Sequence, residues 1–95
     1  MSEARASYLV QTEQHIPTTS TLLPFSDPDY SEPSWKDLRA VIQRLGWTGS
    51  QVSDFVGVES RTVRKWTSPP DTSNHAQVPY AAWRLLLIAA GLVKI

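Results

Sequence analysis

The run GSQVSDFVGVESRTVRKW, residues 49–66, decides the fold of this chain. Its apolar residues recur at helical spacing on both sides of one glycine, Gly57. They are Val52, Phe55, Val56, Val58, Val63 and Trp66. Because glycine interrupts the pattern between two helical segments, the run predicts two short helices joined by a tight turn. The second helix should carry Arg61, Arg64 and Lys65 on the face that points away from the apolar side.

Length and composition set the outer limits. The chain has 95 residues, which fits one domain with a single modest core. It contains no cysteine, so disulfides and thiolate metal sites are excluded. The longest apolar run covers residues 85–93, far short of the roughly 20 residues that a membrane helix needs. The amino terminus does not have the pattern of a secretory signal. We therefore expect a cytoplasmic protein without a membrane partner.

The formal net charge is zero, but the charges are segregated. Residues 1–33 have a balance of −4, residues 34–66 a balance of +3, and residues 67–95 a balance of +1. The net charge of the whole chain is therefore not informative. A basic middle segment beside an acidic one is compatible with a nucleic-acid partner. On charge alone, an ordinary mixed surface is an equal alternative.

The first third of the chain has the composition of an arm. Residues 1–33 are acidic and rich in serine, threonine and proline, with no sustained periodicity, so we expect them to be largely irregular or weakly structured. Two apolar pieces, Tyr8–Val10 and Leu22–Phe25, are candidates for packing onto the domain or for pairing as an edge strand.

Helical patterning begins after this arm. Apolar periodicity predicts helices over residues 35–45, 48–56 and 60–66. Capping signals precede all three helices. They are Ser34 with Asp37, Thr48 with Gln51, and Ser60 alone. Trp35, Trp66 and Trp83 occupy apolar helix positions and are predicted to be core residues, whereas Trp47 either closes the edge of the core or is partly exposed.

Residues 67–78 read as a loop, and a last helix is predicted over residues 79–93. Its only charged residue before the end is Arg84. A helix that is apolar nearly all round is buried on two sides. One side would face the core and the other a second copy of the chain, which favours a homodimer. The predicted self-association residues are Tyr80, Trp83, Leu87 and Ile88. The alternative is a central core helix in a monomer.

The segment from Leu38 to Trp66 resembles the helix-turn-helix of the lambda-repressor-like (Cro/C1, Xre-type) DNA-binding proteins. That family has aliphatic residues at fixed distances from the turn glycine and a large apolar residue nine positions after it. Val52, Val56, Val58, Val63 and Trp66 match these positions. The sequence departs from the family at Ser53, where alanine is usual, at Gly49 and in the long arm.

The tail VPYAAWRLLLIAAG, residues 78–91, is similar to the closing segment of small phage and plasmid regulators. The acidic DPDY, residues 27–30, is similar to autorepressors of anti-CRISPR operons. The resemblance implies an all-α fold, a compact four- to five-helix lambda-repressor-like domain over residues 34–95, with residues 1–33 as an extended arm. It also implies that residues 60–66 form the helix that reads DNA.

Helical geometry and the resemblance agree on the DNA-facing side chains. With Val63 and Trp66 inward, the remaining polar residues of residues 60–66 face outward. The predicted base contacts are Ser60, Arg61, Arg64 and Lys65. The predicted phosphate contacts are Thr48, Ser50, Gln51 and Thr62, beside the start of the second helix or on the third. The alternative is that these basic residues form an ordinary solvated face, and that Thr48 and Gln51 serve only as a cap.

The leading hypothesis is a transcriptional regulator that binds a double-stranded DNA operator as a homodimer and represses its own operon. The chain shows no nucleophile–base pair and no phosphate-cradling glycine loop, so an enzyme is not expected. His15 and His75 lack ligand spacing, and neither a metal nor a cofactor is expected. A second hypothesis is an antitoxin or adaptor whose arm, residues 1–30, binds a partner protein. A third is an accessory factor for replication or recombination.

Overall fold

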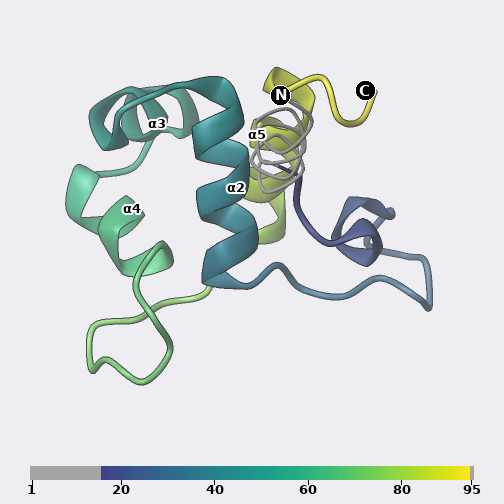
Figure 1. The fold of residues 1–95 in the computed structure, drawn as a ribbon, viewed down its shortest axis with the longest axis horizontal. Helices are drawn as coiled ribbons and strands as arrows, with labels where there is room; N and C mark the ends of the chain where they lie inside the picture. Colours follow the sequence, from purple (N-terminus) through teal and green to yellow (C-terminus); the bar gives the residue numbers. More distant parts are fainter. Residues whose placement is uncertain (1–15, 95) are drawn as a thin grey trace, which may run out of the picture.

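A computed structural model of the protein describes residues 16–94 (Figure 1). Within this range the regular elements are one 3₁₀ turn, η1 (Thr19–Leu22), and four α-helices. The α-helices are α2 (Trp35–Leu45), α3 (Gly49–Val56), α4 (Ser60–Trp66) and α5 (Tyr80–Ala89). The predicted all-α class is therefore confirmed. The apolar piece Tyr8–Val10 lies outside the described residues.

The first two helices begin at the predicted caps. Ser34 and Asp37 form a complete capping box at the start of α2, and Thr48 and Gln51 form another at the start of α3. Each box satisfies two backbone N–H groups that the helix itself leaves without a partner. The prediction for the third helix was wrong. Glu59 occupies the N-cap position of α4 and Ser60 is the first helical residue.

The last helix is shorter than predicted. α5 ends at Ala89 instead of Val93, and Pro79 is its N-cap. Gly91 adopts a left-handed backbone with φ of +74°, and the Leu92 N–H donates to the Leu87 carbonyl at 3.0 Å. A left-handed glycine followed by such a backward bond ends a helix. The chain therefore turns before the last apolar residues.

The core lies where α5 packs against α2 and α3, with α4 closing one side (Figure 1). Its buried members come from all four helices and from Val78 in the loop before α5. They are Leu38, Val41, Val52, Val63, Trp66, Val78, Ala82, Trp83, Leu86 and Leu87. The core positions predicted for Trp66 and Trp83 are thus confirmed.

The other two tryptophans lie at the margin. Trp35 was predicted to be a core residue, and that is wrong: it is half-buried at the first position of α2. Its ring lies 5.6 Å from Lys36 Nζ and 5.2 Å from Arg39 Cζ, a cation–π arrangement with two exposed side chains. Trp47 is also half-buried and packs edge-on against Phe55, with ring centroids 5.1 Å apart.

Residues 16–33 pack against the helical domain, although their sequence has no helical periodicity. The Trp83 Nε1–H donates to the Thr21 carbonyl at 3.0 Å, and Arg84 Nη1 donates to the Leu22 carbonyl at 2.8 Å. Thr21 is buried, and Leu22 packs against the core. The described part of the predicted arm is therefore largely irregular apart from η1, yet it is part of the folded unit because hydrogen bonds from α5 hold it.

The arm segment and α4 occupy opposite sides of the molecule. In Figure 1 residues 16–33 lie to the right of α2 and α5, whereas α4 lies to the left. None of the described helices has the length and apolarity that crossing a membrane requires.

Candidate nucleic-acid interface

The predicted pair of helices joined by a turn is present in α3 and α4. Gly57 ends α3 with a φ of +79°, a conformation that glycine adopts without steric cost. Its N–H and that of Val58 both donate to the Ser53 carbonyl, at 2.9 and 3.1 Å. Val52 from α3 and Val63 from α4 are buried in the same core. The turn and the shared core fix the direction in which the outer face of α4 points.

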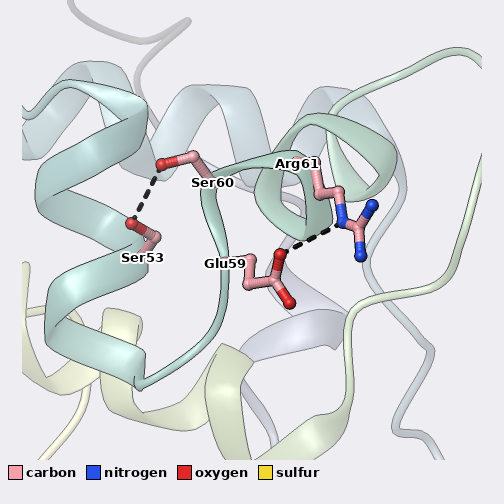
Figure 2. Close-up of polar contacts among 4 residues, drawn as sticks. All are labelled: Ser53, Glu59, Ser60 and Arg61. Carbon is pink, nitrogen blue, oxygen red and sulfur yellow. Dashed lines mark hydrogen bonds and ion pairs between the residues drawn. The ribbon is translucent and has the colours of Figure 1, made fainter.

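The serine at the position where the resembled family has alanine is accommodated by hydrogen bonding. Ser53 is buried, its hydroxyl donates to the Ser50 carbonyl at 2.8 Å, and it lies 3.3 Å from the Ser60 hydroxyl. Figure 2 shows the Ser60 side chain directed toward α3, whereas Arg61 extends from the other side of the chain. Ser60 therefore does not face outward as predicted, because one turn of helix places it above the buried Val63.

The three basic residues predicted on α4 are exposed. Arg61, Arg64 and Lys65 line one shallow depression together with Ser68 and Asn74. The loop that follows α4 forms the opposite wall, because it turns back to the helix end. The return is fixed by two bonds: Ala76 N–H donates to the Lys65 carbonyl at 3.1 Å, and His75 Nδ1 donates to the Ser68 carbonyl at 2.6 Å.

Ser68 and Asn74 were not singled out from the sequence. Residues 67–78 read only as a loop, and nothing in their composition gives the path of that loop. Ser68 is half-buried and its hydroxyl donates to the Arg64 carbonyl at 2.6 Å, so it closes the end of α4. Asn74 is exposed and presents both amide donor and acceptor groups to the depression.

The predicted phosphate contacts surround the start of α3. Gln51 Oε1 accepts from the Thr48 N–H at 2.8 Å, and Thr48 Oγ1 accepts from the Gln51 N–H at 3.2 Å. The cap thus uses only acceptor oxygens and leaves the Thr48 hydroxyl proton and the Gln51 amide donors for a ligand. Ser50 is exposed beside them, whereas Thr62 is half-buried on α4.

A second shallow depression connects α4 to the start of α3. Arg64, Gly49, Gln43 and Arg39 contribute to its lining. Arg64 therefore lies between two positively charged areas, one formed with Arg61 and Lys65 and one shared with Arg39 of α2. Arg39 was not among the residues predicted for this surface.

Arg61 is paired with the residue that precedes α4. Arg61 Nε lies 3.2 Å from Glu59 Oε2, and the two side chains are 68% and 72% exposed (Figure 2). The contact uses the inner nitrogen of the guanidinium, so both terminal nitrogens remain directed away from Glu59 in Figure 2. The sequence contains the signal for this pair, a carboxylate two positions before the arginine, but the prediction did not use it.

The predicted self-association residues divide into two groups. Trp83 and Leu87 have no exposed surface, because they pack in the protomer's own core. They are therefore not accessible to a second copy in this fold, and the prediction needs correction at these two positions. Tyr80 and Ile88 are half-buried and reach the surface. Leu85, on the same helix, is 44% exposed and was not predicted.

Comparison with known proteins adds evidence of ancestry. No protein-family model matches the chain. A protein named transcriptional repressor protein KorC from Escherichia coli is 36% identical over 66 residues, which cover 66% of this chain and 72% of that protein. A second Escherichia coli protein of the same name is 33% identical over 64 residues, which cover 64% of this chain and 69% of its own length. Since similarity of this level extends over more than two thirds of both relatives, the chain belongs to the KorC family of transcriptional repressors.

Proposed function

We propose that this protein is a sequence-specific, double-stranded-DNA-binding repressor that places α4 in the major groove. The observation that carries the proposal is the exposed trio Arg61, Arg64 and Lys65 on the second helix of a tightly joined pair. A helix fits the major groove, and cations on its outer face meet both base edges and phosphates. Membership of a repressor family supports the same conclusion.

The three cations have different roles in this proposal. Arg61 lies near the amino end of α4 and reads a guanine through two parallel hydrogen bonds, a contact worth roughly 1–3 kcal/mol of discrimination. Lys65 contacts a base edge one turn further on. Arg64 contacts a phosphate, because it lies beside Arg39 and the start of α3. Ser60, turned toward Ser53, positions α4 instead of contacting a base.

The start of α3 is the proposed phosphate anchor. Its free N–H groups and the unused donors of Thr48 and Gln51 attract an anion, and Ser50 adds an exposed hydroxyl. Thr62 lies on α4 at the margin of this surface. Contacts of this kind set the register of a protein on DNA without reading its sequence.

A homodimer fits this role. Two copies would present their α4 helices to successive major grooves about 34 Å apart on a two-fold symmetric operator. The outer side of α5, with Leu85, Ile88 and Tyr80, is the proposed contact between the copies. Sedimentation of the pure protein tests this part. A dimer at micromolar concentration that becomes a monomer in Leu85→Glu is expected, and a wild-type monomer would contradict it.

As an autorepressor, the protein would act in the cytoplasm of a bacterial host on its own upstream region.

The adaptor hypothesis needs a different test from a deletion of residues 1–30. Such a deletion would remove Thr21 and Leu22, which pack against the domain. Deletion of residues 1–15 tests the arm while leaving those contacts in place. Unchanged operator binding after this deletion is expected.

The decisive experiment measures binding of a fluorescent duplex from the gene's own upstream region over a series of salt concentrations. Affinity should fall steeply with salt, because each phosphate contact releases counterions. Arg61→Ala combined with Lys65→Ala should lower operator affinity at least about tenfold, given the value of a base contact.

The matched control removes two positive charges elsewhere. Arg44→Ala combined with Lys94→Ala alters the region where Arg44 Nε meets the Ala90 carbonyl at 3.5 Å, near the carboxyl end of the chain and away from α4 (Figure 1). This variant should lose only the general electrostatic attraction. Equal losses in the two double variants would refute the assignment of α4 as the reading helix.

A further inference from the structure

The Glu59–Arg61 pair places a carboxylate on the surface that the proposed function brings to DNA. Glu59 lies directly before α4, the helix whose three cations the proposed function brings to DNA, and it contacts Arg61. A negative charge at this place repels the DNA backbone and lowers general affinity. Its side chain makes no hydrogen bond to the start of the helix, so helix capping does not explain it. The described contact of this carboxylate is the one with Arg61 Nε, at 3.2 Å.

The atoms used in the pair determine what Arg61 still offers. A guanidinium has one N–H at Nε and two at each terminal nitrogen. With Nε turned to Glu59, the two terminal nitrogens lie on the side of the guanidinium away from Glu59 (Figure 2), and the Arg61 side chain is 68% exposed. Two parallel donors directed outward match the O6 and N7 acceptors of guanine in the major groove. The pair therefore holds Arg61 in the orientation that end-on recognition of a guanine requires.

The same carboxylate limits the other use of Arg61. An unrestrained arginine at the rim of a helix can rotate to a phosphate, which contributes affinity for every sequence. Glu59 opposes that rotation in two ways, by holding Nε and by adding a negative charge on the side of the helix start. The pair thus trades general affinity for base discrimination.

Resting on the proposed DNA-binding function, we propose that Glu59 is a positioning residue for sequence specificity, which directs Arg61 to a guanine and away from the phosphates. The proposal predicts two changes, one in the affinity for unrelated DNA and one in the preference for guanine. Removing the Glu59 charge should increase binding to unrelated DNA and should weaken the preference for guanine at one position of the operator. A residue that acted only through its charge would raise both affinities equally.

The experiment begins with selection from a random double-stranded DNA library by the full-length wild-type protein. Binding is then measured for the selected duplex, for the same duplex with single guanines replaced, and for an unrelated duplex. Glu59→Gln keeps the shape of the side chain without its charge. Asp54→Asn is the control, because Asp54 is an exposed carboxylate on α3 whose side chain forms no hydrogen bond or ion pair with α4 in the described structure. Circular dichroism checks that both variants fold.

The expected result is a loss of roughly fivefold in the preference for one guanine in Glu59→Gln, the upper range for an exposed ion pair, with tighter binding of the unrelated duplex. Arg61→Lys keeps the positive charge but has no Nε, so adding Glu59→Gln to it should not change the preference further.

Two other outcomes are decisive. If Glu59→Gln changes the affinity for every duplex by the same factor, as Asp54→Asn is expected to do, or changes the affinity for none of them, the positioning role of Glu59 is refuted while the DNA-binding function stands. If the wild-type protein enriches no sequence, the proposed function fails and this role fails with it.

Discussion

Replacing Trp83 with phenylalanine should release residues 16–33 from the helical domain. Trp83 is fully buried on α5, and its Nε1–H is the donor to the Thr21 carbonyl at 3.0 Å. Phenylalanine keeps an aromatic ring in the core but has no donor and a smaller volume. The Thr21 carbonyl would then be left without its side-chain partner in a place where the residue is only 1% exposed.

The cost follows from two contributions. Leaving a buried carbonyl without its hydrogen bond costs about 1–3 kcal/mol. The smaller ring leaves a cavity that costs about 1 kcal/mol more, since complete removal of a buried aromatic ring costs about 3–5 kcal/mol. The free energy of unfolding should therefore fall by about 3 kcal/mol. For a domain of this size the melting temperature should fall by about 12–24 °C.

Thermal and urea unfolding followed by circular dichroism at the helical band measure this change. Hydrogen exchange locates it, because the Ser31 N–H that donates to the Ser20 carbonyl should exchange faster once the segment is released. Trp47→Phe is the matched control, since Trp47 is only half-buried. A Trp83→Phe melting temperature within about 3 °C of the wild type, or equal to that of the control, would show that this bond does not hold the segment.

The remaining predictions concern acid stability and the turn. Burial raises the pKa of Asp37, but hydrogen bonds from Ser34 and Thr18 outweigh this and lower the pKa below its ordinary value. The resulting stability should be complete above about pH 5 and should disappear as the pH falls below about 4. Unfolding of Asp37→Asn should lack this dependence, and an unchanged pH profile would contradict the argument. Gly57→Ala should cost about 1–2 kcal/mol in chemical unfolding because of its φ of +79°. Gly49→Ala, with ordinary backbone and open space, should be neutral or stabilising, so equal effects would refute the turn argument.

Local signals determined much of the fold. The two capping boxes and Gly57 were recognisable because each involves groups within four residues of one another. Helix ends must satisfy their free backbone groups, so residues that do so locally mark the ends dependably. The exposed cations of α4 were equally predictable, since Val63 and Trp66 on the opposite side fix the direction of the helix.

Local signals failed where a residue contacts another element of the fold. Ser60 was predicted to face outward with Arg61, Arg64 and Lys65, but Ser53, seven positions earlier, supplies a partner in the interior. Trp83 and Leu87 appeared available for a second copy because the sequence does not show how much surface residues 16–33 and the other helices cover. Trp35 has the composition of a core residue and lies instead at the margin under two cations.

The sequence by itself determined the helices, the turn at Gly57 and the basic character of α4. The tertiary structure alone decided three further features. Residues 16–33 are held against α5 by the Trp83–Thr21 hydrogen bond, the loop after α4 returns to form a wall beside Lys65, and Ser60 turns toward Ser53. The physical reason is the distance along the chain between the interacting groups. Backbone groups are satisfied by neighbours in sequence, whereas burial and side-chain orientation depend on residues that only folding brings together.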